Sequence, residues 1–312
     1  MLSRVADALY WMARYVERAE HAARVLDVTQ ATLMDLEEVD PERARIYGSN
    51  AMDQVGLHPD TEWSSAIFDD RLLGSVASSV VRARENARQV RDVISPEMWD
   101  GLNRQYWALM EASKSGAHRE FLSSVLEEVT RSSFLWSGVT DATMSRGTGW
   151  MFIRLGQYVE RTDRVARTFA KLWPVLHHGG VANESPSGPA GAEDNLGWLL
   201  LLRSCGALEE YRKRHPTRFE TGRIMRFMLL EPAFPRTVRY TTRVASSFAE
   251  RIAAQVGARG ASTQRAFGRL AAEVEYVEVS ELLRDGPEPL LEKVRQLLGR
   301  ATSELQEAFF LH

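Results

Sequence analysis

Matching carboxylates and arginines occur in two stretches of the chain, and their spacing suits the binding of charged groups. The stretches RYVERAEHAARVL (14–26) and QYVERTDRVARTF (157–169) are identical at six of thirteen positions. A guanidinium group can bind a carboxylate or phosphate through two parallel N–H bonds, and a positioned carboxylate can act as a general base. The charged positions that the stretches share are Glu17, Arg18, Glu20 and Arg24 in the first, and Glu160, Arg161, Asp163 and Arg167 in the second.

The second acid of each stretch is predicted to face a protein core. On a helix of 3.6 residues per turn, Glu20 falls about 40° from Val16, inside the arc of apolar residues. Because an isolated buried charge is too costly, such a carboxylate must be paired. Arg24 follows Glu20 by one helical turn, and Arg167 follows Asp163 in the same way, which is the favourable acid-before-base order. We interpret these four residues as structural ion pairs.

The Glu-Arg dipeptides of the two stretches allow two interpretations. Arg18 and Arg161 point away from the apolar stripe, so each needs either a second covering layer of protein or a ligand. In one interpretation the charges form an ion-pair network that only fixes helix packing. In the other, which we favour for Glu17, Arg18, Glu160 and Arg161, the two helices present these groups to a shared cleft.

Further arginines could contribute to such a cleft. The stretch 81–103 carries Arg84 and Arg88, and the stretch 234–252 carries Arg239 near a predicted helix start. Arginines at a helix N-terminus oppose the helix dipole, so they make more sense where an anion or an acidic partner binds. A solvated helix face is the alternative. Only four of the 39 basic residues are lysine, so guanidinium chemistry dominates.

The elements that must position these side chains are helices nearly throughout. Apolar residues recur at intervals of three and four, and no stretch shows the clean alternation of a strand. Helices are predicted over 3–36, 72–94, 96–114, 118–142, 147–176, 193–214, 217–230, 235–256, 262–284 and 288–309.

The repeated charged helix predicts an all-α fold, a pseudo-symmetric multi-helix bundle built from two related halves. The halves would span about 1–143 and 144–312 within a single domain, 1–312. Chance similarity of two amphipathic helices is the alternative. The Gly-, Pro- and Ser-rich stretch 177–195 is predicted to be a mobile loop.

Composition excludes several classes of protein. The formal net charge of −3 argues against nucleic-acid binding. The single cysteine, Cys205, excludes an intrachain disulfide and fits a cytoplasmic protein. Charged residues interrupt the N-terminal stretch, so no signal peptide is expected, and no apolar run approaches the ~20 residues of a membrane span. We therefore expect neither nucleic acid nor membrane among the partners.

Motifs for cofactors and enzymes are absent from the sequence. There is no P-loop, no Gly-rich dinucleotide loop and no nucleophile elbow, so no cofactor is expected and the catalytic residues are unknown. Glu17, Glu20 and His21 could suggest a di-iron site. However, Arg164 takes the place of His21 in the second stretch, and arginines surround the acids, so we expect no metal.

Several stretches together resemble the Alpha-E family over nearly the whole chain. They are LYWMARYVERAEHAARVL, the repeated YVER, ARENARQVRDVISPEMWDGLN and LLEPAFPRTVRY. The resemblance implies an all-helical fold and genes or fusions beside circularly permuted ATP-grasp ligases, transglutaminase-like proteins and sometimes a proteasome-like peptidase. The family's Glu-Arg motif maps to Glu17–Arg18 and, in the repeat, to Glu160–Arg161. The second copy departs from the pattern at Thr162–Asp163 and Arg164.

The resemblance and the charged residues together give an expected function. We expect a helical binding or partner protein of an ATP-grasp-type amide-ligase system that makes or modifies a peptide-like compound. Its Arg/Glu-lined cleft would take an acidic peptide, a phosphorylated small molecule or the ligase itself. One alternative is an enzyme of the same pathway that uses Glu17 or Glu160 as general base with an arginine anion clamp. The other is a scaffold whose ion pairs only fix packing.

Overall fold

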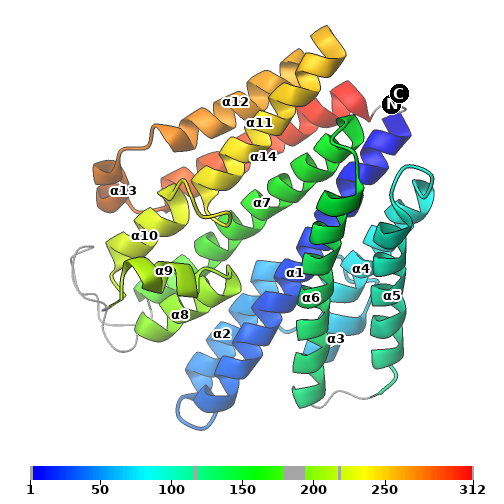
Figure 1. Cartoon of the computed structure of the whole chain (residues 1–312). Helices are drawn as coiled ribbons and strands as arrows, with labels where there is room; N and C mark the ends of the chain where they lie inside the picture. Colours follow the sequence, from blue (N-terminus) through cyan, green and yellow to red (C-terminus); the bar gives the residue numbers. More distant parts are fainter. Residues whose placement is uncertain (1–2, 116–118, 179–193, 217–218, 311–312) are drawn as a thin grey trace. The chain divides into compact units, whose positions relative to one another are not determined.

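The computed structural model describes residues 3–115, 119–178, 194–216 and 219–310, which form helices joined by short connections (Figure 1). Within these ranges no β-strand occurs, so the predicted all-α fold is confirmed. The predicted mobile loop, 177–195, falls largely on 179–193, which lie outside the described residues.

The chain divides into two compact units, Met1–Glu160 and Arg161–His312. The boundary falls within helix α7 (Thr148–His178). The related halves at about residue 143 and the single domain stay predictions from the sequence.

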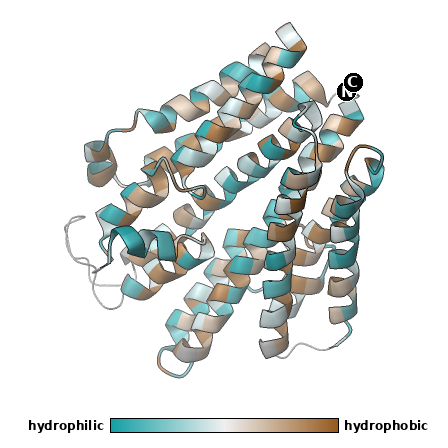
Figure 2. Cartoon of the chain, in the orientation of Figure 1, coloured by the Kyte–Doolittle hydropathy of each residue, from teal (hydrophilic) through white to brown (hydrophobic). Residues whose placement is uncertain are grey.

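Unit 1 is built around the long helix α1 (Ser3–Leu36), which coincides with the first predicted helix. Helix α1 packs against α2 (Pro41–Val55), α4 (Val76–Gln89) and α6 (Arg119–Thr143), and α5 (Pro96–Ala112) packs against α4 and α6. The short helix α3 (Trp63–Phe68) and the start of α7 complete the unit. In Figure 2 the helices mix hydrophobic and hydrophilic residues, as expected for elements that bury one side.

Local signals explain where the helices of unit 1 begin and end. Asp40 caps α2 by accepting a hydrogen bond from the Arg43 N–H at 3.0 Å, and Gly56 ends that helix at a φ of +88°. Helix α2 therefore occupies most of the stretch 40–60, which lies outside the predicted helix ranges. Ser75 caps α4, which consequently starts later than the predicted residue 72.

Helices α1 and α7 approach each other closely at Gly156. A Cβ atom built on Gly156 would overlap the carbonyl oxygen of Tyr10 and would lie 3.1 Å from the Cδ2 atom of its ring. Because only glycine fits against a neighbouring backbone at this distance, this residue allows the part of α7 before Glu160 to lie against α1.

Unit 2 contains the rest of α7 and the helices that follow it. Helix α12 packs against both α11 and α14 (Figure 1). The bounds are α8 (Asp194–Ser204), α9 (Leu208–Arg214), α10 (Thr221–Leu230), α11 (Val238–Val256), the 3-10 turn Gly257–Gly260, α12 (Ala261–Glu275), α13 (Val279–Asp285) and α14 (Glu288–Phe309).

Two predicted helices of unit 2 are interrupted. The predicted helix 193–214 is broken after Ser204, where Gly206 has a φ of +60°. The predicted helix 262–284 is split between α12 and α13. Helix α11 starts at Val238 with Thr237 as its cap, so Pro235 lies in the preceding connection and not in a first helical turn. None of the helices, as far as the chain is described, is long and apolar enough to cross a membrane.

Candidate functional site

The carboxylate of Glu160 joins α7 to two arginines of α1 within unit 1. Arg18 donates from Nε to Oε1 at 2.6 Å and from Nη2 to Oε2 at 3.0 Å, and Arg14 donates from Nε to Oε2 at 2.7 Å. The Glu160 side chain is 0% exposed, whereas those of Arg14 and Arg18 are 11% and 16% exposed. Glu160 is thus fixed as a buried anion, because charge-assisted hydrogen bonds reach both of its oxygens.

Aromatic rings of α1 lie against these guanidinium groups. The Arg14 Cζ atom is 4.6 Å from the centroid of the Trp11 ring, and the Arg18 Cζ atom is 5.1 Å from that of Tyr15. Burial alone lowers the pKa of Arg18, but the charge and hydrogen bonds of Glu160 outweigh it, and the pKa is raised. Arg18 therefore stays charged beside an aromatic face.

The first glutamate of the motif, Glu17, is also buried, and it contacts the second stretch. Gln157 lies 3.4 Å from Glu17 through its Nε2 atom, and its Oε1 atom accepts a hydrogen bond from Arg154 at 2.7 Å. Arg14 and Gln157 occupy equivalent positions of the two stretches. Each therefore contacts the glutamate of the other stretch. The comparison of the two stretches missed both residues because it considered only positions where the two stretches share a charge.

The two expected structural ion pairs differ from each other. Glu20 is 2% exposed and accepts hydrogen bonds from both Nε, at 2.9 Å, and Nη2 of Arg24. In the second stretch the Asp163 side chain is 22% exposed, and Arg167 Nε lies 3.9 Å from its Oδ2 atom. Asp163 is therefore less buried than Glu20, although it too lies within ion-pair distance of an arginine. Aspartate is one methylene shorter than glutamate, and its ion pair with Arg167 is correspondingly looser.

The candidate arginines of α4 contact different partners. Arg84 donates to the Asn103 side chain at 2.8 Å and lies 4.4 Å above the Tyr106 ring of α5. Arg88 is exposed and forms a surface pair with Glu85. Arg82, which we did not single out, is exposed and has its Cζ atom 5.9 Å from the Tyr15 ring that Arg18 also contacts.

The candidate arginines of unit 2 bind the end of α10 and the connection that follows it. Arg161 donates to the Pro235 carbonyl at 3.4 Å, and Arg239 donates to the Leu230 carbonyl at 3.2 Å. Arg239 also lies 3.4 Å from the Glu275 carboxylate. Arg243 similarly donates to the Pro232 carbonyl at 2.9 Å. Backbone carbonyls thus take the role that we expected of an anion, and prolines in this connection supply no N–H of their own.

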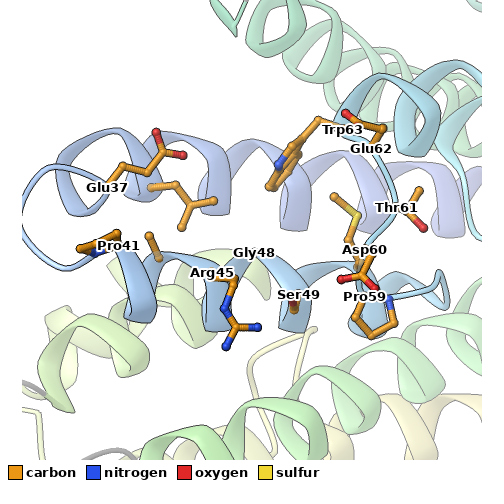
Figure 3. Close-up of a pocket in the computed structure, with 13 residues that line it drawn as sticks. Glu37, Pro41, Arg45, Gly48, Ser49, Pro59, Asp60, Thr61, Glu62 and Trp63 are labelled. Atoms are coloured by element: carbon orange, nitrogen blue, oxygen red, sulfur yellow. The ribbon is translucent and has the colours of Figure 1, made fainter.

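A polar pocket lies elsewhere in unit 1, between the end of α1, helix α2 and the residues before α3. Its volume is about 360 Å³. Figure 3 shows the Trp63 ring directed into the space between α1 and α2, with Glu37 toward one end and Asp60 toward the other. Glu62 adds a third carboxylate, against the single guanidinium of Arg45. Because the lining carries more negative than positive charge, this pocket is not a suitable site for binding an anion. In the described part of the chain, no group of three or more His, Cys, Asp or Glu side chains could hold a metal ion.

An all-helical fold with a buried Glu–Arg network at a repeated YVER sequence defines a class of helical proteins marked by this motif. The chain belongs to the Alpha-E family, described as a predicted alpha-helical domain with a conserved ER motif, and the family model matches residues 1–310.

Relatives of the chain are longer mycobacterial proteins. The chain is 26% identical over 263 residues to "Uncharacterized protein Rv2567" of Mycobacterium tuberculosis strain H37Rv and to "Uncharacterized protein Mb2597" of Mycobacterium bovis. Each similarity covers 76% of this chain but 28% of the relative, so the chain matches only one region of these proteins. No solved structure matches the chain.

Proposed function

We propose that the chain is a helical binding protein of an ATP-grasp-type amide-ligase system, and that the Arg18 region of unit 1 receives an anionic group. The observation that carries this proposal is the pair of guanidinium groups at Tyr15. Arg18 and Arg82 lie 5.1 and 5.9 Å from the ring centroid. Among the side chains that the structure describes, Arg82 has no carboxylate within ion-pair distance. An anion held there would accept charge-assisted hydrogen bonds from the guanidinium groups.

The anion would be a carboxylate of an acidic peptide, a phosphorylated small molecule or an acidic surface of the ligase. The link to a ligase rests on the family resemblance alone. Of the arginines proposed from the sequence, the contacts favour Arg18. On α4 the contacts favour Arg82, rather than Arg84 or Arg88, as the residue that binds the anion. Arg161 and Arg239 remain candidates for anion binding within unit 2. The proposed location is the cytoplasm.

The enzyme alternative depends on a carboxylate with an accessible lone pair. Both Glu160 oxygens accept hydrogen bonds from arginines, so this residue is a poor general base. The alternative therefore turns to Glu17, the other glutamate proposed for that role, which is buried and contacts Gln157 at 3.4 Å. The scaffold alternative is supported by the burial of Glu160 and requires no ligand.

We also propose that the chain is one domain of two related halves, about 1–143 and 144–312. The contacts of Arg14 with Glu160 and of Gln157 with Glu17 support this proposal, because equivalent positions of the two stretches exchange partners.

Binding of a circularly permuted ATP-grasp-type ligase, the class of partner that the family resemblance implies, tests the proposal. We expect the purified wild-type chain to retain the ligase, and Arg82→Gln to weaken binding about tenfold, since one charge-assisted contact is lost. The substitution leaves no buried carboxylate without a partner, so the fold should persist. Arg131→Gln, at an exposed pair with Glu128 on α6, is the matched control. Equal binding by the two variants would remove Arg82 from the site, and no binding by the wild type would refute the ligase partnership.

A further inference from the structure

A second pocket, in unit 2, lies between the start of α10 and α13 and has a volume of about 500 Å³. Three arginines line it: Arg223 and Arg226 from α10, and Arg284 from α13. Glu220 is the one acidic residue of the lining. The lining therefore carries more positive than negative charge, in a chain whose net charge is −3.

The three arginines differ in their partners. Arg223 pairs with Glu220 at 2.8 Å, and Arg284 pairs with the neighbouring Asp285 at 2.8 Å. Arg226 is exposed and, among the side chains that the structure describes, has no carboxylate within 4.0 Å. Its guanidinium fork is thus available to a ligand in the pocket.

The charges of the same arginines act on His215, the residue that ends α9. The pKa of His215 is lowered, first by burial and then by the charges of Arg223, Arg214 and Arg226, although Glu220 opposes them. A lowered histidine pKa is expected where cations disfavour a further positive charge.

Helix α13 also contributes apolar side chains to the pocket. Val279 and Leu283 lie one helical turn apart on α13, and both line the pocket while remaining partly exposed. A ligand that fills the pocket would bury apolar surface against them, which favours binding by ~25 cal/mol per Å² removed from water.

We propose that this pocket binds a small organic anion: a carboxylate or phosphate monoester is held by Arg226 and Arg223, and an apolar group of the same molecule lies against Val279 and Leu283. The pocket lies within residues 220–284. Its occupant need not be the anion bound near Arg18, so the inference does not depend on the proposed function.

Calorimetric titration of the full chain with four small probes tests the proposal. N-acetyl-leucine carries both required groups, N-acetyl-leucinamide lacks the charge, N-acetyl-glycine lacks the apolar group, and isobutyl phosphate replaces the carboxylate. We expect N-acetyl-leucine to bind about tenfold more tightly than either the amide or the glycine derivative. Whichever of N-acetyl-leucine and isobutyl phosphate binds more tightly identifies the anionic group that the pocket prefers. Added salt should weaken the binding of both compounds.

A variant of Arg226 assigns the binding to this pocket. Arg226→Gln should weaken binding of the preferred anion about tenfold, whereas Arg300→Gln, an exposed control on α14, should leave binding unchanged. The proposal would be overturned if neither N-acetyl-leucine nor isobutyl phosphate bound at millimolar concentration. It would also be overturned if N-acetyl-leucinamide bound as tightly as N-acetyl-leucine, or if Arg226→Gln bound the preferred anion with unchanged affinity.

Discussion

Arg18 and Glu160 lie 142 positions apart in the sequence and form a bidentate ion pair, with Nε–Oε1 at 2.6 Å and Nη2–Oε2 at 3.0 Å. The arginine belongs to one copy of the Glu-Arg motif and the glutamate to the other. Since Glu160 is fully buried, this pair couples the fold of unit 1 directly to the motif that marks the family.

Loss of the Glu160 charge should destabilise the chain strongly. Glu160→Gln keeps the shape of the side chain, but Arg14 and Arg18 would then share a neutral amide that has only one acceptor oxygen. We expect a loss of about 3 kcal/mol in the free energy of unfolding, measured by urea denaturation. Glu85→Gln, at the exposed pair with Arg88, should change it by less than about 1 kcal/mol. Equal losses in the two variants would contradict this account of the network.

Gly156 should not tolerate a side chain. In Gly156→Ala the new methyl group meets the Tyr10 backbone, so α1 and α7 must separate, at a cost of about 1–3 kcal/mol. Gly138→Ala on α6 is the matched control, because a Cβ atom there meets nothing within 4 Å. It should stabilise the helix by up to about 1 kcal/mol. Thermal melting measures both changes: the melting temperature should fall in Gly156→Ala and rise in Gly138→Ala. A rise in both variants would exclude a tight contact at Gly156.

The sequence was sufficient for the helical class, for α1 and for the pairing of Glu20 with Arg24, because these depend on periodicity within one helix. It was insufficient where the partner of a side chain lies on another element of the fold. A helical wheel shows that Arg161 leaves the apolar stripe, but not that the Pro235 carbonyl lies there. Likewise, the turn at Gly206 depends on backbone geometry that the surrounding apolar pattern conceals.

Two acids should affect the pH dependence of stability in opposite ways. Burial raises the pKa of Asp27, although the Ser123 hydroxyl, which donates to it at 2.6 Å, opposes this shift. The folded chain then holds this proton more tightly than the unfolded chain does, so the group's contribution to stability is lost as pH rises above about 4. Asp27→Asn should therefore raise stability at pH 7 relative to the parent, and the advantage should shrink toward pH 3.

Glu292 provides the comparison of opposite sign. Hydrogen bonds from Arg295 and then Gln296 lower its pKa to about 2. The folded chain releases this proton more readily, so the stabilisation is present above about pH 4 and is lost as pH falls toward 2. Glu292→Gln should thus lower stability slightly at pH 7 and have no effect near pH 2. Denaturation curves across this range test both residues, and shifts of the same sign would refute the assignment.

The equivalent arginines Arg24 and Arg167 should differ in their contribution to stability. Arg24 binds a carboxylate that is 2% exposed, so Arg24→Met would leave Glu20 as a buried charge without this partner, at a cost of about 3 kcal/mol. Arg167 lies 3.9 Å from a carboxylate that is 22% exposed, so Arg167→Met should cost less than about 1 kcal/mol. Methionine keeps most of the aliphatic stem in both variants, which isolates the charge. Urea denaturation at pH 7 measures both losses. A smaller loss for Arg24→Met than for Arg167→Met would show that burial of the acid does not determine the strength of these pairs.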